Sequence, residues 1–260
     1  MQGEAEAAIN RRGADVYADF LIPHLRSDSI VLDCGCGPGT ITLGLAEAVP
    51  QGRVIGVDLD VTGLVGARQT AALLERKNLS WIRADGRSLP FDNAIFNAVL
   101  CHSMLEVLGD PAPVVAELRR VTKRGGVVGA ASVEYEGIIL AGEPAAGPRR
   151  FYDIRQRLWR AAGIAEPNLG RRLRGLFDAA GFSRVEAFAH YISYGTLDRV
   201  RAFAADRAAE CRDRELHAAV TRYGIASTEE LLELGSGWEK WGNDPAAFFA
   251  FPWCRVLAWR

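Results

Sequence analysis

Short apolar runs alternate with longer amphipathic segments in the first half of the chain. The apolar runs occupy residues 29–35, 53–60, 79–86, 95–103 and 125–135. They do not alternate strictly between apolar and polar positions, which is typical of strands that are buried on both faces. The pattern therefore predicts a parallel sheet that is covered by helices on both sides.

The segments between these runs repeat apolar residues at helical spacing. They cover residues 40–49, 61–77 and 110–126. In the third, Asp110 can cap the helix, Pro111 takes the first helical position, and basic residues followed by Gly125 close it. Alternation of strands and helices predicts βαβ units and a doubly wound α/β sheet.

The rhythm changes after Tyr135. Residues 136–148 are rich in Gly, Ala and Pro and are predicted to form a connection. The remaining segments are predicted to be helix at 149–180, strand at 183–195, two or three helices within 197–242, and an aromatic-rich strand at 246–259. The complete pattern predicts a Rossmann-like sheet of seven strands, with helical insertions on either side of the sixth strand.

Composition and charge narrow the class of protein. The 260 residues are 49% hydrophobic and 24% charged, which is ordinary for a globular chain. The net charge of −1 lacks the basic footprint of nucleic-acid-binding proteins. We find no run of about 18 apolar residues that could span a membrane and no apolar signal-peptide core at the N-terminus. The sequence therefore predicts a soluble, cytoplasmic protein that binds neither nucleic acid nor membranes.

A glycine-rich stretch, VLDCGCGPGT, carries the first chemical signal. The apolar run breaks into Asp33, and Gly35, Gly37 and Gly39 follow at alternate positions, with cysteines at 34 and 36. The spacing differs from the dinucleotide-binding G-x-G-x-x-G pattern. The stretch can be a ligand-cradling loop, a pair of metal-binding thiols or a tight turn. The five cysteines are scattered, with no second Cys/His pair at zinc-site spacing, so neither a disulfide framework nor a metal site is expected.

Acidic residues at the ends of the next two strands favour the ligand-cradling loop. Asp58 lies 19 residues after Gly39 and can accept hydrogen bonds from ribose hydroxyls. Asp85 ends the third strand. Because the carboxyl ends of parallel strands line one crevice, Asp33, Asp58 and Asp85 are expected on the same rim. The alternative is that each acid caps a helix or fills a turn. The loop has no neighbouring Lys or Arg, which suits a ligand without a phosphate.

The motifs VLDCGCGPG, VIGVDLD, RADGRSLPFDNAIFNAVLCHSMLEVLGDP and ELRRVTKRGGVV occur in this order over about residues 28–135. This array resembles the class I S-adenosylmethionine-dependent methyltransferases, in particular the small-molecule branch of ubiquinone/menaquinone-type and natural-product enzymes. The resemblance implies S-adenosylmethionine as the cofactor, and the following roles. Asp33 and the loop of Gly35, Cys36, Gly37 and Gly39 hold its amino acid end. Asp58 binds the ribose, Leu59 lies against the adenine, and Asp85 accepts from the adenine amino group beside the Gly86 backbone. Cys101 and His102 line the methionine side and the methyl group, and Tyr17 contacts the cofactor from an N-terminal cover helix.

Three residues are candidates for a catalytic base. His102 directly follows the fourth strand, Glu106 lies one turn further on, and His190 lies in the predicted strand 183–195. The family often has Leu-Glu-His-Leu after the fourth strand, whereas this chain has Val107 at the histidine position. Each candidate can also have a packing role. Histidine is the side chain best suited to act as a base near pH 7.

Residues outside the motif half must form the acceptor pocket. The segment 149–174 is rich in arginine, which fits either a solvated helix face or the recognition of a carboxylate or phosphate. Its arginines are Arg149, Arg150, Arg155, Arg157, Arg160, Arg171, Arg172 and Arg174. Aromatic residues are dense late in the chain, where most are expected in the core and a few against an apolar acceptor. They are Trp238, Trp241, Phe248, Phe249, Phe251 and Trp253.

The predicted organisation is one methyltransferase domain over residues 1–260. Within it we expect an N-terminal cover helix (1–27), a cofactor-binding core (28–135) and a helical substrate cover (136–182 and 196–245). The expected function is transfer of a methyl group from S-adenosylmethionine to oxygen or carbon of a small apolar or aromatic metabolite. The alternatives are a cofactor-binding protein that catalyses a cyclisation or elimination, and an RNA methyltransferase. The sequence leaves the oligomeric state open.

Overall fold

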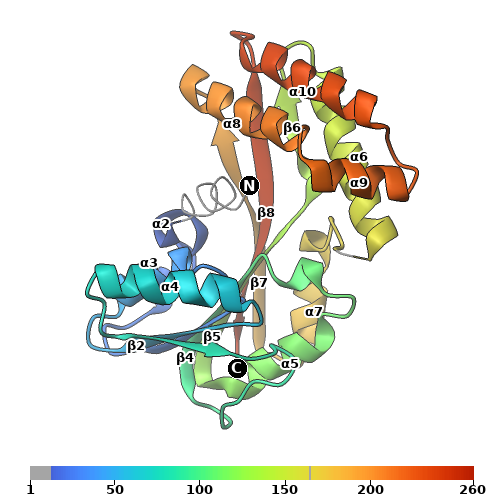
Figure 1. Ribbon diagram of the computed structural model, residues 1–260. Coiled ribbons are helices and arrows are strands. Elements are labelled where there is room, and N and C mark those ends of the chain that lie inside the picture. Colours follow the sequence, from blue (N-terminus) through green and yellow to red (C-terminus); the bar gives the residue numbers. More distant parts are fainter. Residues whose placement is uncertain (1–12, 164) are drawn as a thin grey trace.

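A mixed sheet runs the full length of the molecule (Figure 1). The computed structural model describes residues 13–163 and 165–260. The strands are β1 (Ile30–Cys34), β2 (Arg53–Asp58), β3 (Leu79–Arg83), β4 (Phe96–His102), β5 (Thr122–Val133), β6 (Ile139–Ala141), β7 (Arg184–Tyr194) and β8 (Phe248–Trp259). Their order is β3-β2-β1-β4-β5-β8-β6, and β7 also pairs with β8.

The predicted parallel core is confirmed. Strands β1 to β5 pair in parallel, and β8 runs antiparallel to β5, β6 and β7. The short strand β6 was not predicted, because it falls in the segment expected to be a connection. It pairs with Phe248–Ala250 of β8, beyond the part of β8 that pairs with β5. Since β7 occupies the other edge of β8, the sheet keeps the predicted width of seven positions.

Helices cover both faces of the core. They are α2 (Ala14–Tyr17), α3 (Thr40–Ala48), α4 (Val61–Leu73), α5 (Ala112–Val121), α6 (Ala146–Ala162), α7 (Leu173–Ala179), α8 (Leu197–Glu210), α9 (Arg214–Arg222) and α10 (Thr228–Gly242). Along β1, Val31 packs with Leu45 of α3, whereas Leu32 packs with Val114 and Leu118 of α5. The strands thus bury side chains on both faces, which is the reason that their sequences lack strict alternation.

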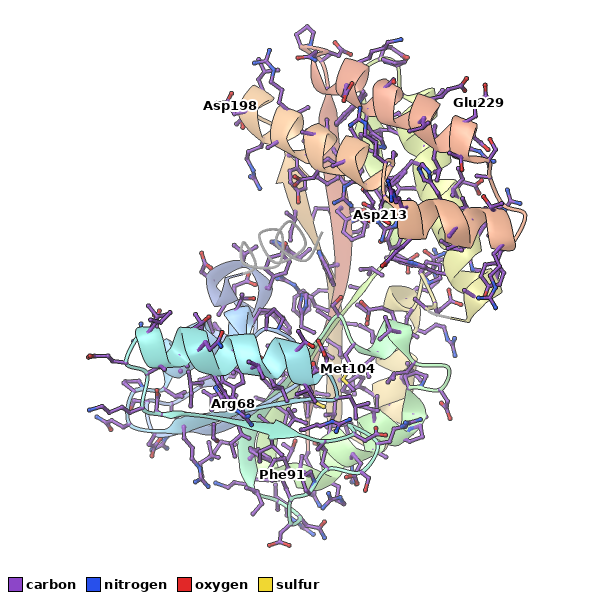
Figure 2. The ribbon with its side chains drawn as sticks, in the orientation of Figure 1. Arg68, Phe91, Met104, Asp198, Asp213 and Glu229 are labelled. Carbon is purple, nitrogen blue, oxygen red and sulfur yellow. The ribbon has the colours of Figure 1, made fainter. Side chains whose placement is uncertain are left out.

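The later helices form a cover around the far half of β8 (Figure 1). Three of them begin at polar N-cap residues: the side chains of Thr196, Asp213 (Figure 2) and Ser227 each accept a backbone N–H of the first turn. Trp238 and Trp241 of α10 are fully buried, and the indole Nε1 of Trp241 donates to the Ala141 carbonyl at 2.8 Å. This cover corresponds to the predicted helical insertions.

Several boundaries differ from the prediction. The helix expected at 149–180 forms as two helices, α6 and α7. Helix α5 ends at Val121, and Thr122 already begins β5. Gly125 therefore does not cap the helix; it lies inside β5 with φ of +74°, and its N–H donates to the Arg260 carbonyl. The predicted N-terminal cover helix is represented by α2, and its first twelve residues lie outside the described part of the chain. Among the described residues, no helix has the length and hydropathy that a membrane span requires.

Candidate functional site

The glycine loop is a tight connection between β1 and α3. Gly35, Gly37 and Gly39 have φ of +80°, +51° and +79°, in the region that favours glycine. A Cβ on Gly39 would lie 2.3 Å from the Trp81 ring, so this position also needs the small residue. A Cβ on Gly37 would meet no atom within 4 Å. The loop therefore presents open backbone at Gly37, as a ligand cradle requires.

The three predicted acids lie at successive strand ends, but their environments differ. Asp58 accepts from the Gly37 N–H at 2.7 Å and from the Asp60 N–H at 2.9 Å, so it holds the glycine loop. Asp85 pairs with Arg87 at 2.6 Å, and the hydrogen bonds from Arg87 lower the pKa of its carboxyl. Next to Asp58, the Leu59 side chain is 52% exposed, free to flank a planar ligand.

Asp33 is the buried member of this group. Its side chain is 2% exposed and accepts from the Thr42 hydroxyl at 2.6 Å. Burial raises the pKa of Asp33 to about 7; the Thr42 hydrogen bond opposes this rise and the charge of Asp58 adds to it. A bound cation would instead favour the ionised carboxylate. A positively charged ligand would therefore stabilise the ionised form of the Asp33 carboxyl.

Asp33 should make the ligand-free protein less stable as the pH rises. Its pKa is higher in the folded chain than in the unfolded chain, so its stabilising contribution is complete below about pH 4 and is lost as the pH rises through about 7. Between pH 5 and pH 7 we expect the free energy of unfolding to fall by about 2 kcal/mol from this group. Urea denaturation at both pH values measures it. Asp33→Asn should remove this part of the fall, and an identical fall in the variant would refute the assignment.

The thiols beside the loop are inert side chains. Cys34, Cys36 and Cys101 are buried, and burial, followed by neighbouring carboxylate charge, raises the pKa of Cys34 and Cys36. The same burial raises the pKa of Cys101. Within residues 13–163 and 165–260, no group of three His, Cys, Asp or Glu side chains is arranged to hold a metal ion. The thiols therefore pack as small apolar residues.

Met104 lies across the crevice between the glycine loop and Gly86. Its Sδ is 3.9 Å from the Cys34 Sγ and 3.8 Å from the Cys101 Sγ. A Cβ on Gly35 would lie 2.8 Å from this side chain, and one on Gly86 would lie 2.6 Å from its Cε. Ser103, with φ of +56°, turns the chain before it. Figure 2 places Met104 at the end of the core that faces the cover. Nothing in the sequence pattern distinguished this residue.

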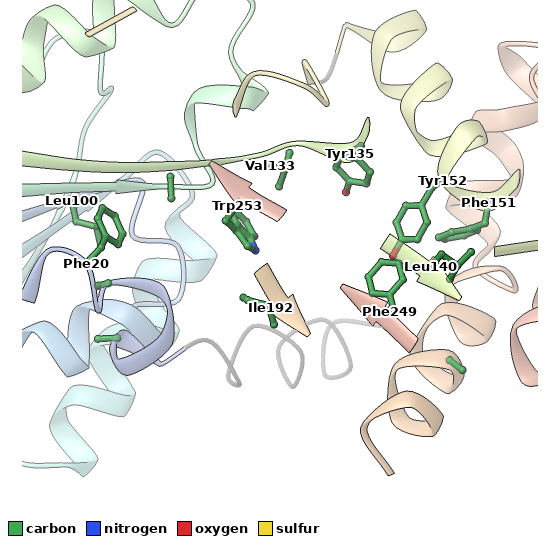
Figure 3. Close-up of a cluster of buried hydrophobic side chains, with 14 of the residues drawn as sticks. Phe20, Leu100, Val133, Tyr135, Leu140, Phe151, Tyr152, Ile192, Phe249 and Trp253 are labelled. Carbon is green, nitrogen blue, oxygen red and sulfur yellow. The ribbon is translucent and has the colours of Figure 1, made fainter. Parts of the chain in front are cut away.

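A cavity of about 660 Å³ begins where β4 ends and continues between the sheet and the cover. Aromatic and aliphatic side chains of β5, β7, β8, α6 and α8 form most of its wall. Figure 3 shows Trp253 and Ile192 on one side of this region and Tyr135 and Tyr152 on the other. The lining includes Tyr17, Ser103, Glu106, Val107, Tyr135, Tyr152, Arg155, Trp159, Ile192, Tyr194, Arg199, Phe203, Asp206, Arg207, Phe251 and Trp253. Trp253 and Phe251 are the late aromatics that face a pocket, whereas Trp238, Trp241 and Phe249 are core.

Tyr17 and Trp253 separate His102 from the cavity. The His102 ring packs against Trp253 with a centroid distance of 4.5 Å and meets Tyr17 edge-on at 5.2 Å. His102 is buried and does not line the cavity. His190 pairs with Trp253 across β7 and β8 and also does not line it. Burial and the nearby Arg255 lower the pKa of His190. Of the three predicted bases, two are therefore set back from the cavity.

Glu106 is the predicted base that reaches the cavity wall. It is 3% exposed, and its Oε2 accepts from the Ser132 hydroxyl at 2.8 Å. It follows β4 by one short turn, η2 (Leu105–Val107), which brings it to the carboxyl edge near the crevice. A carboxylate at this place can accept a proton from a ligand that spans the crevice and the cavity.

Within the described part of the chain, four of the eight arginines of segment 149–174 form ion pairs outside the cavity, and one turns inward. Arg150 and Arg157 pair with Asp153, Arg160 with Glu166, and Arg171 with Glu134 and Glu136. Arg155 instead turns inward and lines the cavity. It pairs with Glu210 of α8, which Arg207 also contacts at 2.8 Å. The solvated-face alternative thus holds for these four arginines. Arg199 and Arg207, which also line the cavity, were not predicted, because α8 is remote in sequence from this segment.

The segment that forms this crevice has relatives among known sequences. Residues 31–126 match the family model described as a methyltransferase domain. An uncharacterised methyltransferase of Schizosaccharomyces pombe is 37% identical over 45% of this chain and 44% of its own. A probable methyltransferase of Aspergillus luteorubrus, ltbC, is 27% identical over 96% and 92%. A demethylmenaquinone methyltransferase of Shouchella clausii is 35% identical over 40% and 45%. The chain thus spans less than half of two of these relatives and nearly all of the other.

Solved structures share the fold over most of the chain. The YcgJ protein of Bacillus subtilis superposes with a TM-score of 0.58 at 18% identity, covering 93% of this chain and 97% of that one. The [4+2]-cyclase SpnF superposes with a TM-score of 0.55 at 23% identity, covering 90% and 79%. These likenesses include the helical cover, so the α/β fold with its inserted helices is shared beyond the matched segment.

Proposed function

Since this chain contains a class I S-adenosylmethionine-dependent methyltransferase domain, we propose that it transfers a methyl group from that cofactor to oxygen or carbon of a small, largely aromatic acceptor. The observation that carries the proposal is the aromatic cavity of about 660 Å³ that opens at the carboxyl edge of the core. Its volume is that of a site for a small organic molecule.

The residues at the core edge fit the chemistry of this cofactor. S-adenosylmethionine carries an ammonium, a sulfonium and an unphosphorylated ribose, and when bound it supplies the methyl group. Asp33 would hold the ammonium and Asp58 the ribose hydroxyls, with Leu59 against the adenine. Open backbone at Gly37 leaves room beside these groups. Asp85 would reach the adenine amino group while it keeps its bond to Arg87.

The catalytic contribution of the chain would be positioning and proton removal. In-line displacement gains much of its rate from holding the reacting atoms in contact. Tyr17 and Trp253 form an aromatic wall where the cavity meets the core, which would orient a planar acceptor. We assign proton removal to Glu106, because it lines the cavity, and a packing role to His102 and His190. Closure by the aromatic wall would also keep water from the acceptor.

Met104 should limit cofactor binding. Because the side chain lies against Gly35 and Gly86, a bound cofactor would have to displace it. We expect Met104→Ala to bind S-adenosylhomocysteine about threefold more tightly, and to lower the free energy of unfolding by about 1–2 kcal/mol through lost packing. Calorimetric titration and urea denaturation measure the two effects. Met104→Leu, which keeps the volume, is the control. Weaker binding by the alanine variant, restored by leucine, would mean that this side chain packs on the cofactor instead.

Labelled cofactor tests the proposed function. The purified protein would be incubated with methyl-labelled S-adenosylmethionine and a metabolite extract of its host, with Asp58→Ala as the inactive control. We expect label in a small organic compound with the wild type alone. Tight cofactor binding without label transfer would favour a cyclase or binding protein. Label in nuclease-sensitive material would identify an RNA methyltransferase. Either outcome would overturn the proposal.

A further inference from the structure

The far end of the cavity carries an uneven set of charges. Arg155, Arg199 and Arg207 line it, together with Asp206. Glu210 bridges Arg155 and Arg207 but is not itself part of the lining. Among the described residues this end therefore has three guanidinium groups against two carboxylates, which leaves one net positive charge.

Arg155 and Arg207 are both held by Glu210, whose single negative charge neutralises only part of their combined positive charge. Their side chains are 19% and 23% exposed. Arg155 lies over the Trp159 ring at 4.8 Å, and Arg207 lies over the Phe203 ring at 5.4 Å. The Nε of Arg207 is buried and has no hydrogen-bond partner among residues 13–163 and 165–260. One carboxylate cannot satisfy two guanidinium groups, each with five N–H donors. Donors therefore remain for a further anion.

The surrounding wall suits a flat, apolar body rather than a hydrated ion. The Tyr135 ring lies 5.7 Å from the Tyr152 ring and 5.1 Å from the Trp159 ring by centroid distance. Figure 3 shows Tyr135 and Tyr152 on the same side of this region. Burial is also sufficient to lower the pKa of Arg155, so water screens this group poorly. Charge-assisted hydrogen bonds are strongest where water is excluded.

We propose that the acceptor is a planar aromatic carboxylate, bound with its anionic group against Arg155 and Arg207 and its reacting end toward Glu106. This inference specifies the substrate class of the proposed function. It rests on that function only in treating the bound molecule as the methyl acceptor. The binding preference itself needs no methyl transfer. The single net charge favours a monoanion, and the aromatic wall between the two ends favours one or two fused or linked rings.

Matched pairs of acids and amides test the charge preference. The probes are benzoate, 2-naphthoate and biphenyl-4-carboxylate, each with its neutral carboxamide, titrated calorimetrically into the full chain saturated with S-adenosylhomocysteine. We expect at least one acid to bind about tenfold or more tightly than its amide. Arg207→Gln should bring that ratio close to one without weakening the amide. Arg155→Gln should act in the same direction.

Arg157→Gln is the matched control, because Arg157 lies on the same helix and pairs with Asp153 outside the cavity. It should leave the ratio unchanged. Thermal denaturation of each variant shows whether it is folded. If Arg155→Gln is unfolded, the acid-to-amide ratio of Arg207→Gln alone tests the proposal. Three acids that bind no better than their amides, or a ratio that survives Arg207→Gln, would overturn the proposal. Label transfer to a neutral acceptor would overturn it too while leaving the methyltransferase function intact.

Discussion

Asp58→Ala is expected to weaken the binding of S-adenosylmethionine by about 100-fold to 1,000-fold. Each Asp58 oxygen already accepts one backbone N–H, from Gly37 and from Asp60, and has lone pairs left for a ribose hydroxyl. Alanine would remove two charge-assisted bonds to the ribose, which we count at the lower end of their range, about 1.5–2 kcal/mol each. A loss of about 3–4 kcal/mol corresponds to the stated range. Calorimetric titration with S-adenosylhomocysteine measures it.

Asp60→Ala separates this effect from general destabilisation. Asp60 caps α4 by accepting from the Thr62 and Gly63 N–H groups. Its loss should lower the free energy of unfolding by about 1 kcal/mol and leave cofactor affinity within about threefold. Asp58→Asn keeps the shape without the charge and should fall between the two. If Asp58→Ala bound the cofactor within threefold of the wild type, this residue would have no part in ribose binding.

Glu106→Gln is expected to lower kcat by about 100-fold without changing cofactor affinity. A general base contributes about 100-fold to 10,000-fold, and we take the lower figure because positioning remains intact. The carboxylate lines the cavity and is held by Ser132, whereas glutamine keeps the size but cannot take the proton. Single-turnover measurement of label transfer with the identified acceptor tests this. The rise of the rate with pH that a base produces should be absent in the variant.

Ser132→Ala and His102→Asn complete the test of the base. The Ser132 hydroxyl holds the Glu106 carboxylate in place, so its removal should cost only a few-fold in rate and keep the rise of the rate with pH. His102→Asn should keep that rise, since His102 lies behind Tyr17 and Trp253. If the rise of the rate with pH disappeared in His102→Asn and remained in Glu106→Gln, His102 would be the base and Glu106 would have the packing role.

The core could be predicted from the sequence because its signals are local. Each apolar run of the first half forms a strand, and the glycine loop with Asp58 and Asp85 lies at one edge as expected. Gly125 was misassigned because a glycine after basic residues also fits a helix end, and only pairing with the C-terminal strand shows that β5 has begun. Strand β6 was missed because three residues carry too little periodicity.

The acceptor cavity could not be predicted because no local pattern defines it. Arg155 lies in the same arginine-rich segment as Arg150 and Arg157, yet it alone of the three contacts Glu210 of α8, which is 55 residues away in the sequence. His102 was the first candidate for a base because it directly follows β4. The ring of Trp253, from the other end of the chain, turns it into a packed residue.

Strand β8 would set the length of the proposed acceptor. It passes from Trp253, beside His102 at the edge of the core, to Phe249, which stacks on Tyr152 of the cover at 5.5 Å. From Phe249 to Trp253 the strand advances by four residue steps, or about 13 Å. It pairs with β7 throughout this stretch and with β6 and β5 at its two ends, so the separation between the two ends of the cavity is fixed. The number of residues in this part of β8 thus sets the distance between the two ends of the cavity. Relatives that gained or lost two residues in β8 would keep the same side chains inward and select acceptors longer or shorter by about 7 Å.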